Sequence, residues 1–183
     1  RMIFLSASIP DPKRNEKYFM SSDVIAIRDS VRALASVVIP KSNLIWGGHP
    51  AITPLIRYVM STMEVNVQSH ITLYQSDFFR EMFPDDNEYF ENVVITRNLR
   101  DRDKSLLEMR TRMFQENEFV AGIFIGGMEG VELEYDMFRR IHPNAKLFPV
   151  ASTGAAAKFI YDSMDVKPER ALVDDFAYMS LFR

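Results

Sequence analysis

The sequence predicts an α/β fold, a single Rossmann-like domain over residues 1–183 with a mainly parallel sheet and helices on both of its faces. Apolar runs of strand length alternate with longer stretches of helical period, which is the pattern of βαβ units. The runs "VVI" and "VAGIFI" show no polar alternation, as expected of central parallel strands that are buried on both faces. A chain of 183 residues is long enough for one domain with a substantial core.

Six apolar runs have the length of a strand. Between the third and the fourth, the segment Ser76–Glu91 is acidic and aromatic, and we expect a loop or a short helix there rather than a strand. The candidate strands are Ile3–Ser8, Asn43–Gly47, His70–Tyr74, Asn92–Thr96, Phe119–Gly126 and Lys146–Val150.

Five stretches have the spacing of apolar residues that is typical of an amphipathic helix. Asp23 is the expected N-cap of the first helix, which reaches Val38. Thr53 precedes a proline, so we expect it to cap a second helix that runs to about Glu64. The remaining helices are Asp101–Glu116, Gly130–Ile141 and Gly154–Ser163.

Composition excludes several classes of function. The net charge of −3 provides no bulk positive field, so we expect no nucleic-acid partner. Cysteine is absent, which excludes disulfides and thiolate metal sites and fits a cytoplasmic location. No apolar stretch approaches the roughly 20 residues of a membrane span, so no membrane partner is expected. The three histidines are scattered without ligand spacing, and we expect neither a metal nor a cofactor.

Small residues gather where three predicted strands end. Because the carboxyl ends of parallel strands meet at one edge of the sheet, where helix N-termini attract anions, this pattern predicts a shared cleft for a phosphate or a sugar. The alternative is that the glycines only serve tight turns between strands and helices. Neither a dinucleotide-binding nor a P-loop glycine pattern is present. The candidate residues are Gly47, Gly48, Gly126, Gly127, Gly130, Ser152, Thr153 and Gly154, with Ser6 and Ser8 at the end of the first strand.

Four side chains near these strand ends are further candidates. His49 follows the first glycine pair, where it is expected to donate to a phosphate or to stack on a base, unless it is an exposed loop histidine. Thr53 and Thr153 are expected to combine helix capping with phosphate contact. Arg97 lies after the fourth strand and is expected to reach the ligand, although a solvated loop charge explains it nearly as well.

The stretch Leu106–Phe138, "LLEMRTRMFQENEFVAGIFIGGMEGVELEYDMF", resembles the signature of the SLOG (Smf/DprA–LOG) superfamily. In the LOG enzymes of that family, a helix with an M-x-x-R-K-like motif leads into a strand that ends P-G-G-x-G-T-x-x-E. Arg110 and Glu134 match the arginine and the glutamate of this signature. The chain departs from it at Ile125, at Val131 and by one additional residue between the glycines.

These departures make the chain more similar to divergent, sensor-type SLOG domains of bacterial conflict systems than to the LOG hydrolases. The resemblance implies binding of an NAD- or ADP-ribose-derived nucleotide, with Glu134 on the ribose, Arg110 in electrostatic support and Glu129 as a nearby alternative contact. It also implies a homodimer or a fused or associated effector, and a setting in antiviral defence.

Three alternatives remain. The chain could be a LOG-type nucleoside 5′-monophosphate phosphoribohydrolase, an N-glycosidase in which Glu134 and Arg110 are catalytic. It could be an interaction module that has lost its ligand. A deoxyribosyltransferase-like function, suggested by the opening "IFLSAS", ranks last because the expected acidic strand end is absent.

Overall fold

The computed structural model describes residues 1–183 and contains one six-stranded sheet with the order β4-β3-β2-β1-β5-β6. Every neighbouring pair of strands is parallel, which confirms the predicted α/β Rossmann-like fold. The six strands are β1 (Met2–Ser8), β2 (Asn43–Trp46), β3 (Ile71–Ser76), β4 (Val93–Thr96), β5 (Ala121–Gly126) and β6 (Lys146–Val150).

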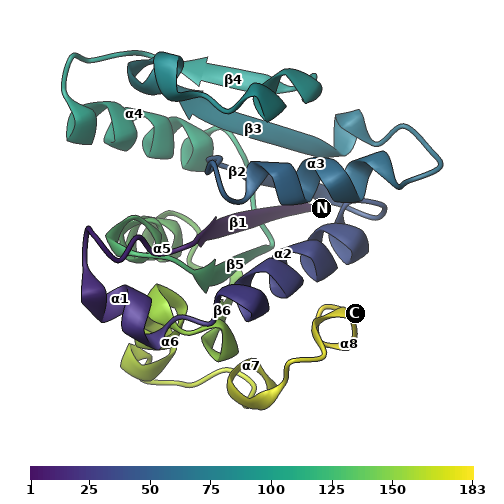
Figure 1. Ribbon diagram of the computed structural model, residues 1–183, viewed down its shortest axis with the longest axis vertical. Helices are drawn as coiled ribbons and strands as arrows, with labels where there is room; N and C mark the ends of the chain where they lie inside the picture. The colour runs from purple at the N-terminus through teal and green to yellow at the C-terminus, as the bar shows by residue number, and fades with distance from the viewer.

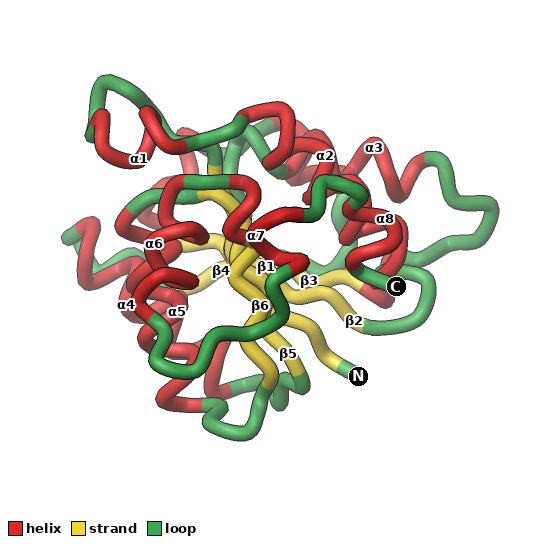
Figure 2. Tube along the Cα trace, turned by 90° about the horizontal axis from the view of Figure 1, so that it is seen from below, coloured by secondary structure: helices red, strands yellow, loops and turns green.

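Helices cover both faces of this sheet, and in Figure 2 the strands run between two groups of helices. One group contains α2 (Val24–Val38), α3 (Thr53–Ser61) and α8 (Tyr178–Leu181). The other contains α4 (Arg102–Gln115), α5 (Glu129–Ile141) and α6 (Ala155–Ser163). The shorter elements are α1 (Glu16–Ser21), α7 (Ala171–Asp174) and the 3-10 turns η1 (Gln68–His70), η2 (Asp77–Met82), η3 (Asp85–Tyr89) and η4 (Ala151–Thr153).

The alternation of side chains along β1 divides the core into two parts. Leu5 packs with the residues of α2 and α3 on one face, whereas Phe4 packs with those of α4 and α5 on the other. Ser6 is two residues after Phe4, so its side chain points to the α4–α5 face as well. Phe4 stacks on Phe138 of α5 with ring centroids 5.3 Å apart, which fixes α5 over β1.

The chain changes direction between β1 and β5. From β1 it proceeds outward through β2 and β3 to β4, and α4 then returns it across the sheet so that β5 pairs with the free side of β1. At the end of this pairing Ser8 is the register partner of Gly126. Ligands of open α/β sheets bind at the carboxyl ends of the strands next to such a switch point, which is at the left in Figure 1.

Several predicted bounds are wrong in detail. Thr53 does not cap α3, because Ile52 is the N-cap and the Thr53 hydroxyl donates to the carbonyl of His49 at 2.9 Å. Helix α3 ends at Ser61 rather than near Glu64.

The helices α1, α7 and α8 were not predicted, since elements of four to six residues are too short for a helical period to emerge. The segment Ser76–Glu91 contains η2 and η3, as its irregular composition predicted. None of the helices is both long and apolar enough to cross a bilayer.

Candidate functional site

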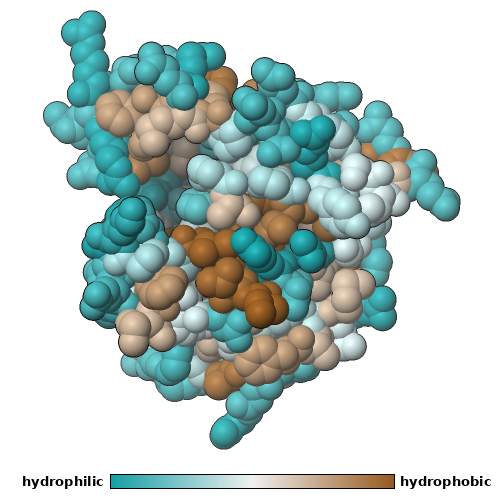
Figure 3. All heavy atoms as spheres, in the orientation of Figure 1, coloured by the Kyte–Doolittle hydropathy of each residue, from teal (hydrophilic) through white to brown (hydrophobic).

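A cavity of about 470 Å³ opens at the carboxyl ends of β1, β2 and β3. The rest of its wall comes from the connection after β1, the segment that contains η2, α4 and the first turns of α5. On the molecular surface this region is the hollow at the left of Figure 3. The volume lies within the range of roughly 300–1,000 Å³ that small-molecule sites occupy.

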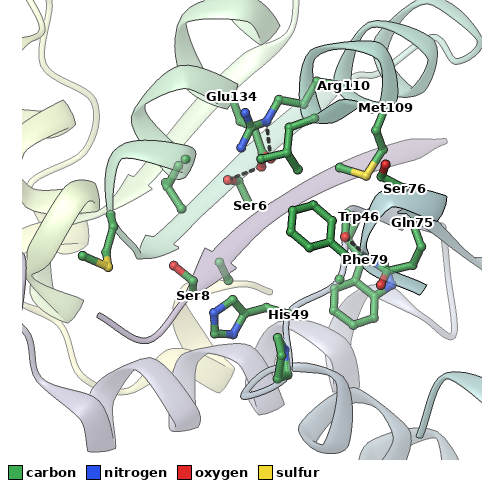
Figure 4. A pocket seen from close by; sticks show the side chains of 18 of the residues that line it. Ser6, Ser8, Trp46, His49, Gln75, Ser76, Phe79, Met109, Arg110 and Glu134 are labelled. Atoms are coloured by element: carbon green, nitrogen blue, oxygen red, sulfur yellow. Dashed lines mark hydrogen bonds and ion pairs between the residues drawn. The ribbon is translucent and has the colours of Figure 1, made fainter. Parts of the chain in front are cut away.

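Glu134 is the centre of the polar wall of this cavity (Figure 4). Its Oε1 accepts a hydrogen bond from the Ser6 hydroxyl at 2.7 Å, and its Oε2 accepts one from Arg110 Nε at 3.0 Å. The side chains of Arg110 and Glu134 are only 12% and 13% exposed. Three elements, β1, α4 and α5, therefore hold one carboxylate in a fixed orientation toward the cavity.

Two glycines make room for this ion pair. A Cβ on Gly47 would lie 3.1 Å from the Met109 methyl and 4.0 Å from Glu134 Oε2. A Cβ on Gly130 would lie 3.1 Å from an Arg110 guanidinium nitrogen. Because these two positions carry no side chain of their own, Met109 and Arg110 can pack closely over them beside the carboxylate.

The turn after β2 is fastened by Gln75 at the end of β3. The Gln75 amide donates to the carbonyls of Gly47 and Tyr74, and its Oε1 accepts from Asn87 Nδ2 at 3.3 Å. Gly48 has a φ of +74°, and a Cβ there would collide with the Gln75 amide at 2.3 Å. Only glycine fits this conformation beside Gln75.

His49 is a neutral donor in the same turn. Its Nδ1 accepts the backbone N–H of Ala51 at 3.1 Å, so the ring proton is on Nε2. Burial, and to a lesser extent the positive charge of Arg14, lowers the pKa of His49 from 6.5 to about 4. At neutral pH the ring is therefore uncharged, and Nε2–H is available to a ligand oxygen.

Positive charge reaches the cavity from its rim. Arg14 and Arg102 line it, and each has only an exposed partner, Glu129 at 4.0 Å and Asp103 at 3.0 Å respectively. The N-terminus of α5 has no side-chain cap and lies at the same wall, with unpaired N–H groups expected in its first turn. Asp11 and Glu134 are the acidic residues of the lining.

About half of the predicted site residues come together in this cavity. The ones that line it are Ser6, Ser8, Gly47, Gly48, His49, Arg110, Gly130 and Glu134. The ones that do not are Thr53, Arg97, Gly126, Gly127, Glu129, Ser152, Thr153 and Gly154.

The end of β6 lies outside the cavity because α1 closes it. Ser152 bonds the Tyr178 hydroxyl at 2.7 Å, and Thr153 is fully buried between the Val150 carbonyl and the Gly126 N–H rather than capping a helix. Gly154 is the N-cap of α6, and a Cβ there would lie 1.8 Å from the Ser21 carbonyl oxygen. The backbone N–H at this helix start already bonds the Ser21 hydroxyl.

Other predicted contacts have partners within the protein. Arg97 donates from Nε and from a terminal guanidinium nitrogen to the same Glu108 oxygen, Oε1, at 3.0 and 2.8 Å on the surface. The Gly127 N–H donates to the Ser8 carbonyl at 2.9 Å, so the second glycine pair shapes the turn between β5 and α5. Glu129 accepts from Asn15 at 3.3 Å outside the cavity.

Sequence reasoning missed the lining that follows β3 and the face of α4 above it. Gln75 lies at a strand end as the glycine pairs do, but it is not a small residue, so the pattern of small strand-end residues did not include it. Arg14 had no signal, because it lies in the connection before an unpredicted helix. The missed lining residues include Arg14, Gln75, Arg102, Leu106 and Met109.

No group of three or more His, Asp or Glu side chains is close enough to hold a metal ion.

A family model described as the SLOG cluster3 family matches residues 17–183, nearly the whole chain. No protein of curated function matches the sequence, and no solved structure matches it.

Proposed function

The chain belongs to the SLOG cluster3 family, and we propose that it binds and senses a nucleotide-derived small molecule of the NAD- or ADP-ribose-derived class in the cavity beside Glu134. The observation that supports this most is the Glu134 carboxylate, which two neighbouring elements orient inside a cavity of ligand size. The proposal includes a role in bacterial antiviral defence and signalling to a second copy or an effector, both by resemblance to sensor-type SLOG domains.

The carboxylate suits a ribose. Each Glu134 oxygen already accepts one protein hydrogen bond and has lone-pair capacity for another. Two vicinal hydroxyls of a ribose can thus donate to one carboxylate, a pairing that is strengthened because the acceptor is charged.

Phosphate groups of the ligand have donors on both sides of this carboxylate. The uncapped start of α5 supplies backbone N–H groups and a favourable helix dipole. His49 Nε2 and the weakly paired Arg14 and Arg102 supply side-chain donors around the mouth. The cavity thus offers donors to phosphates and an acceptor to sugar hydroxyls.

The geometry favours binding over cleavage. General acid–base cleavage of a glycosidic bond uses two carboxylates that flank the bond, and the only other acid in the lining is Asp11 in the connection after β1. Both oxygens of Glu134 already accept hydrogen bonds from Ser6 and Arg110, so the ion pair with Arg110 holds this carboxylate in place as an acceptor of ligand hydroxyls. The same ion pair also supports the alternative, an N-glycosidase in which Glu134 stabilises an oxocarbenium-like centre.

One experiment separates the two functions. The protein is screened by thermal shift and titration calorimetry against AMP, ADP-ribose, cyclic ADP-ribose and NAD, and each mixture is then analysed for released base. A sensor is stabilised by a ligand that stays intact, since binding to the folded state raises the melting temperature. Released base would establish the N-glycosidase.

The variant Glu134→Gln should not bind this ligand. The NH2 group of the glutamine amide cannot accept a hydrogen bond from a ligand hydroxyl, and the side chain lacks the negative charge of the carboxylate. Asp136→Asn is the matched control on the same helix, where Asp136 pairs with Arg139 on the exposed face at 3.3 Å. Stabilisation by none of the four nucleotides, or unchanged binding to Glu134→Gln, would refute the proposed site.

A further inference from the structure

The cavity has a second wall that differs in chemistry from the Glu134 side. It is apolar and comes from two elements, the segment after β3 and the inner face of α4. The residues are Phe79, Met82, Phe83, Pro84, Leu106 and Met109. Because a nucleotide has a charged end and a planar apolar end, a cavity with two such walls constrains which way round the ligand lies.

Phe79 is the aromatic side chain of this wall that lies at a kink in the backbone of η2. It is the one residue of η2 with non-helical dihedrals, a φ of −100° and a ψ of 16°, and this kink separates the turn into two halves. Phe79 lines the cavity, in Figure 4 beside Trp46 and Gln75, whereas its neighbour Phe78 does not. The two rings pack edge to face with centroids 5.0 Å apart, and Phe78 lies on the side away from the cavity.

The segment between β3 and β4 has a first half, residues 77–83, and a second half, residues 84–91, which differ in their contacts with the rest of the domain. The second half bonds to neighbouring elements: Asp86 pairs with Arg57 of α3 at 2.8 Å, and the Tyr89 carbonyl accepts from Gln68 at 2.9 Å. Phe90 is buried against Trp46.

The first half makes polar contacts only within itself and to the end of β3. Asp77 pairs with Arg80, and the Phe78 N–H donates to the Ser76 hydroxyl at 3.3 Å. No hydrogen bond or ion pair joins residues 77–83 to α3 or α4. This half is held at the cavity by apolar contact alone, so Phe79 can adjust to a ring laid against it.

We infer that Phe79 stacks on the nucleobase of the ligand. This inference rests on the proposed function and adds the orientation of the ligand: phosphate and ribose at the Glu134 wall, base under η2. Every base has a π-face, so stacking on one aromatic ring provides affinity without requiring hydrogen bonds to the base edge.

The test uses AMP, ADP-ribose, cyclic ADP-ribose and NAD, all of which contain adenine, and four proteins: the wild type, Phe79→Ala, Phe79→Trp and the matched control Phe78→Ala. Phe79→Ala should lose about 10- to 100-fold in affinity, the effect typical of removing a ring that stacks on a base. Phe78→Ala should stay close to the wild type, because its ring does not reach the cavity.

Phe79→Trp separates stacking from simple packing. A tryptophan there should restore affinity, and its fluorescence should be quenched on binding by more than that of the wild type, whose single tryptophan, Trp46, also lines the cavity. Equal affinity of Phe79→Ala and the wild type, or failure of Phe79→Trp to restore binding and report quenching, would overturn the inference alone. Absence of binding of all four nucleotides to the wild type would instead overturn the proposed function, and the inference with it.

Discussion

Ser6 and Glu134 lie 128 residues apart in the chain and are joined by a hydrogen bond of 2.7 Å between the Ser6 hydroxyl and Glu134 Oε1. The bond links the central strand β1 to α5 at the point where β5 has just been added to the other side of the sheet. Arg110 completes the arrangement from α4. The carboxylate is consequently positioned by the topology of the whole domain rather than by one loop.

Removing Arg110 should destabilise the protein because Glu134 would remain largely buried without its cation. For Arg110→Met we expect a loss of about 1–3 kcal/mol in the free energy of unfolding, measured by urea titration at pH 7. Arg112→Met, two residues further along α4, is the control: Arg112 and Glu116 are 38% and 41% exposed, and a change of under about 0.5 kcal/mol is expected. Equal effects of the two substitutions would contradict a special role for the Arg110 pair.

The glycines after β2 should respond differently to the same substitution. Gly48→Ala should lower stability by about 1–3 kcal/mol, because alanine is strained at a φ of +74° and collides with the Gln75 amide. Gly47→Ala should fold nearly normally, since the first atom it meets is the end of the flexible Met109 side chain. It should nevertheless weaken ligand binding, because its methyl group stands 4.0 Å from Glu134 Oε2. Thermal melts together with calorimetric titration would check both, and tight binding to Gly47→Ala would count against a ligand in this place.

Gln75→Glu tests the clamp on the same turn without changing side-chain size. A carboxylate cannot donate, so it loses both bonds to the Gly47 and Tyr74 carbonyls and repels them. We expect a loss of about 1–3 kcal/mol in urea unfolding and weaker ligand binding. Gln115→Glu, at the exposed end of α4, serves as the control with the same change of charge. A Gln75→Glu protein as stable as the control would show that the clamp contributes little.

The sequence predicted the sheet well because buried parallel strands are continuous apolar runs, and it predicted the Arg110–Glu134 pair through a family resemblance. It could not predict that the β6 end is closed, since this depends on α1, a helix of six residues whose Ser21 fills the space over Gly154. The expectation that small strand-end residues line a shared cavity holds for Gly47 and fails for Ser152, and only the packing of a distant element distinguishes them. Phe79 could not be distinguished from Phe78 for a similar reason: a kink within an irregular segment, rather than a repeating pattern, turns it toward the cavity.

His49 should make stability depend on pH in the acidic range. Its pKa is about 4 in the folded protein and near 6.5 when unfolded, so between these values the unfolded chain binds more protons and stability falls as the pH falls. The contribution is complete above pH 6.5, and about 1–2 kcal/mol of it should be lost between pH 7 and pH 5. His49→Asn keeps an acceptor for the Ala51 N–H but has no group that titrates there, so its urea-unfolding free energy should drop less over the same interval.

The same histidine should make ligand binding depend on pH. An anionic ligand beside the His49 ring would favour the protonated imidazole. The affinity of the wild type for this ligand should therefore rise from pH 7 to pH 5 relative to the affinity of His49→Asn. Parallel pH profiles for the two proteins, in stability and in binding, would contradict the location of His49 at both the buried turn and the ligand.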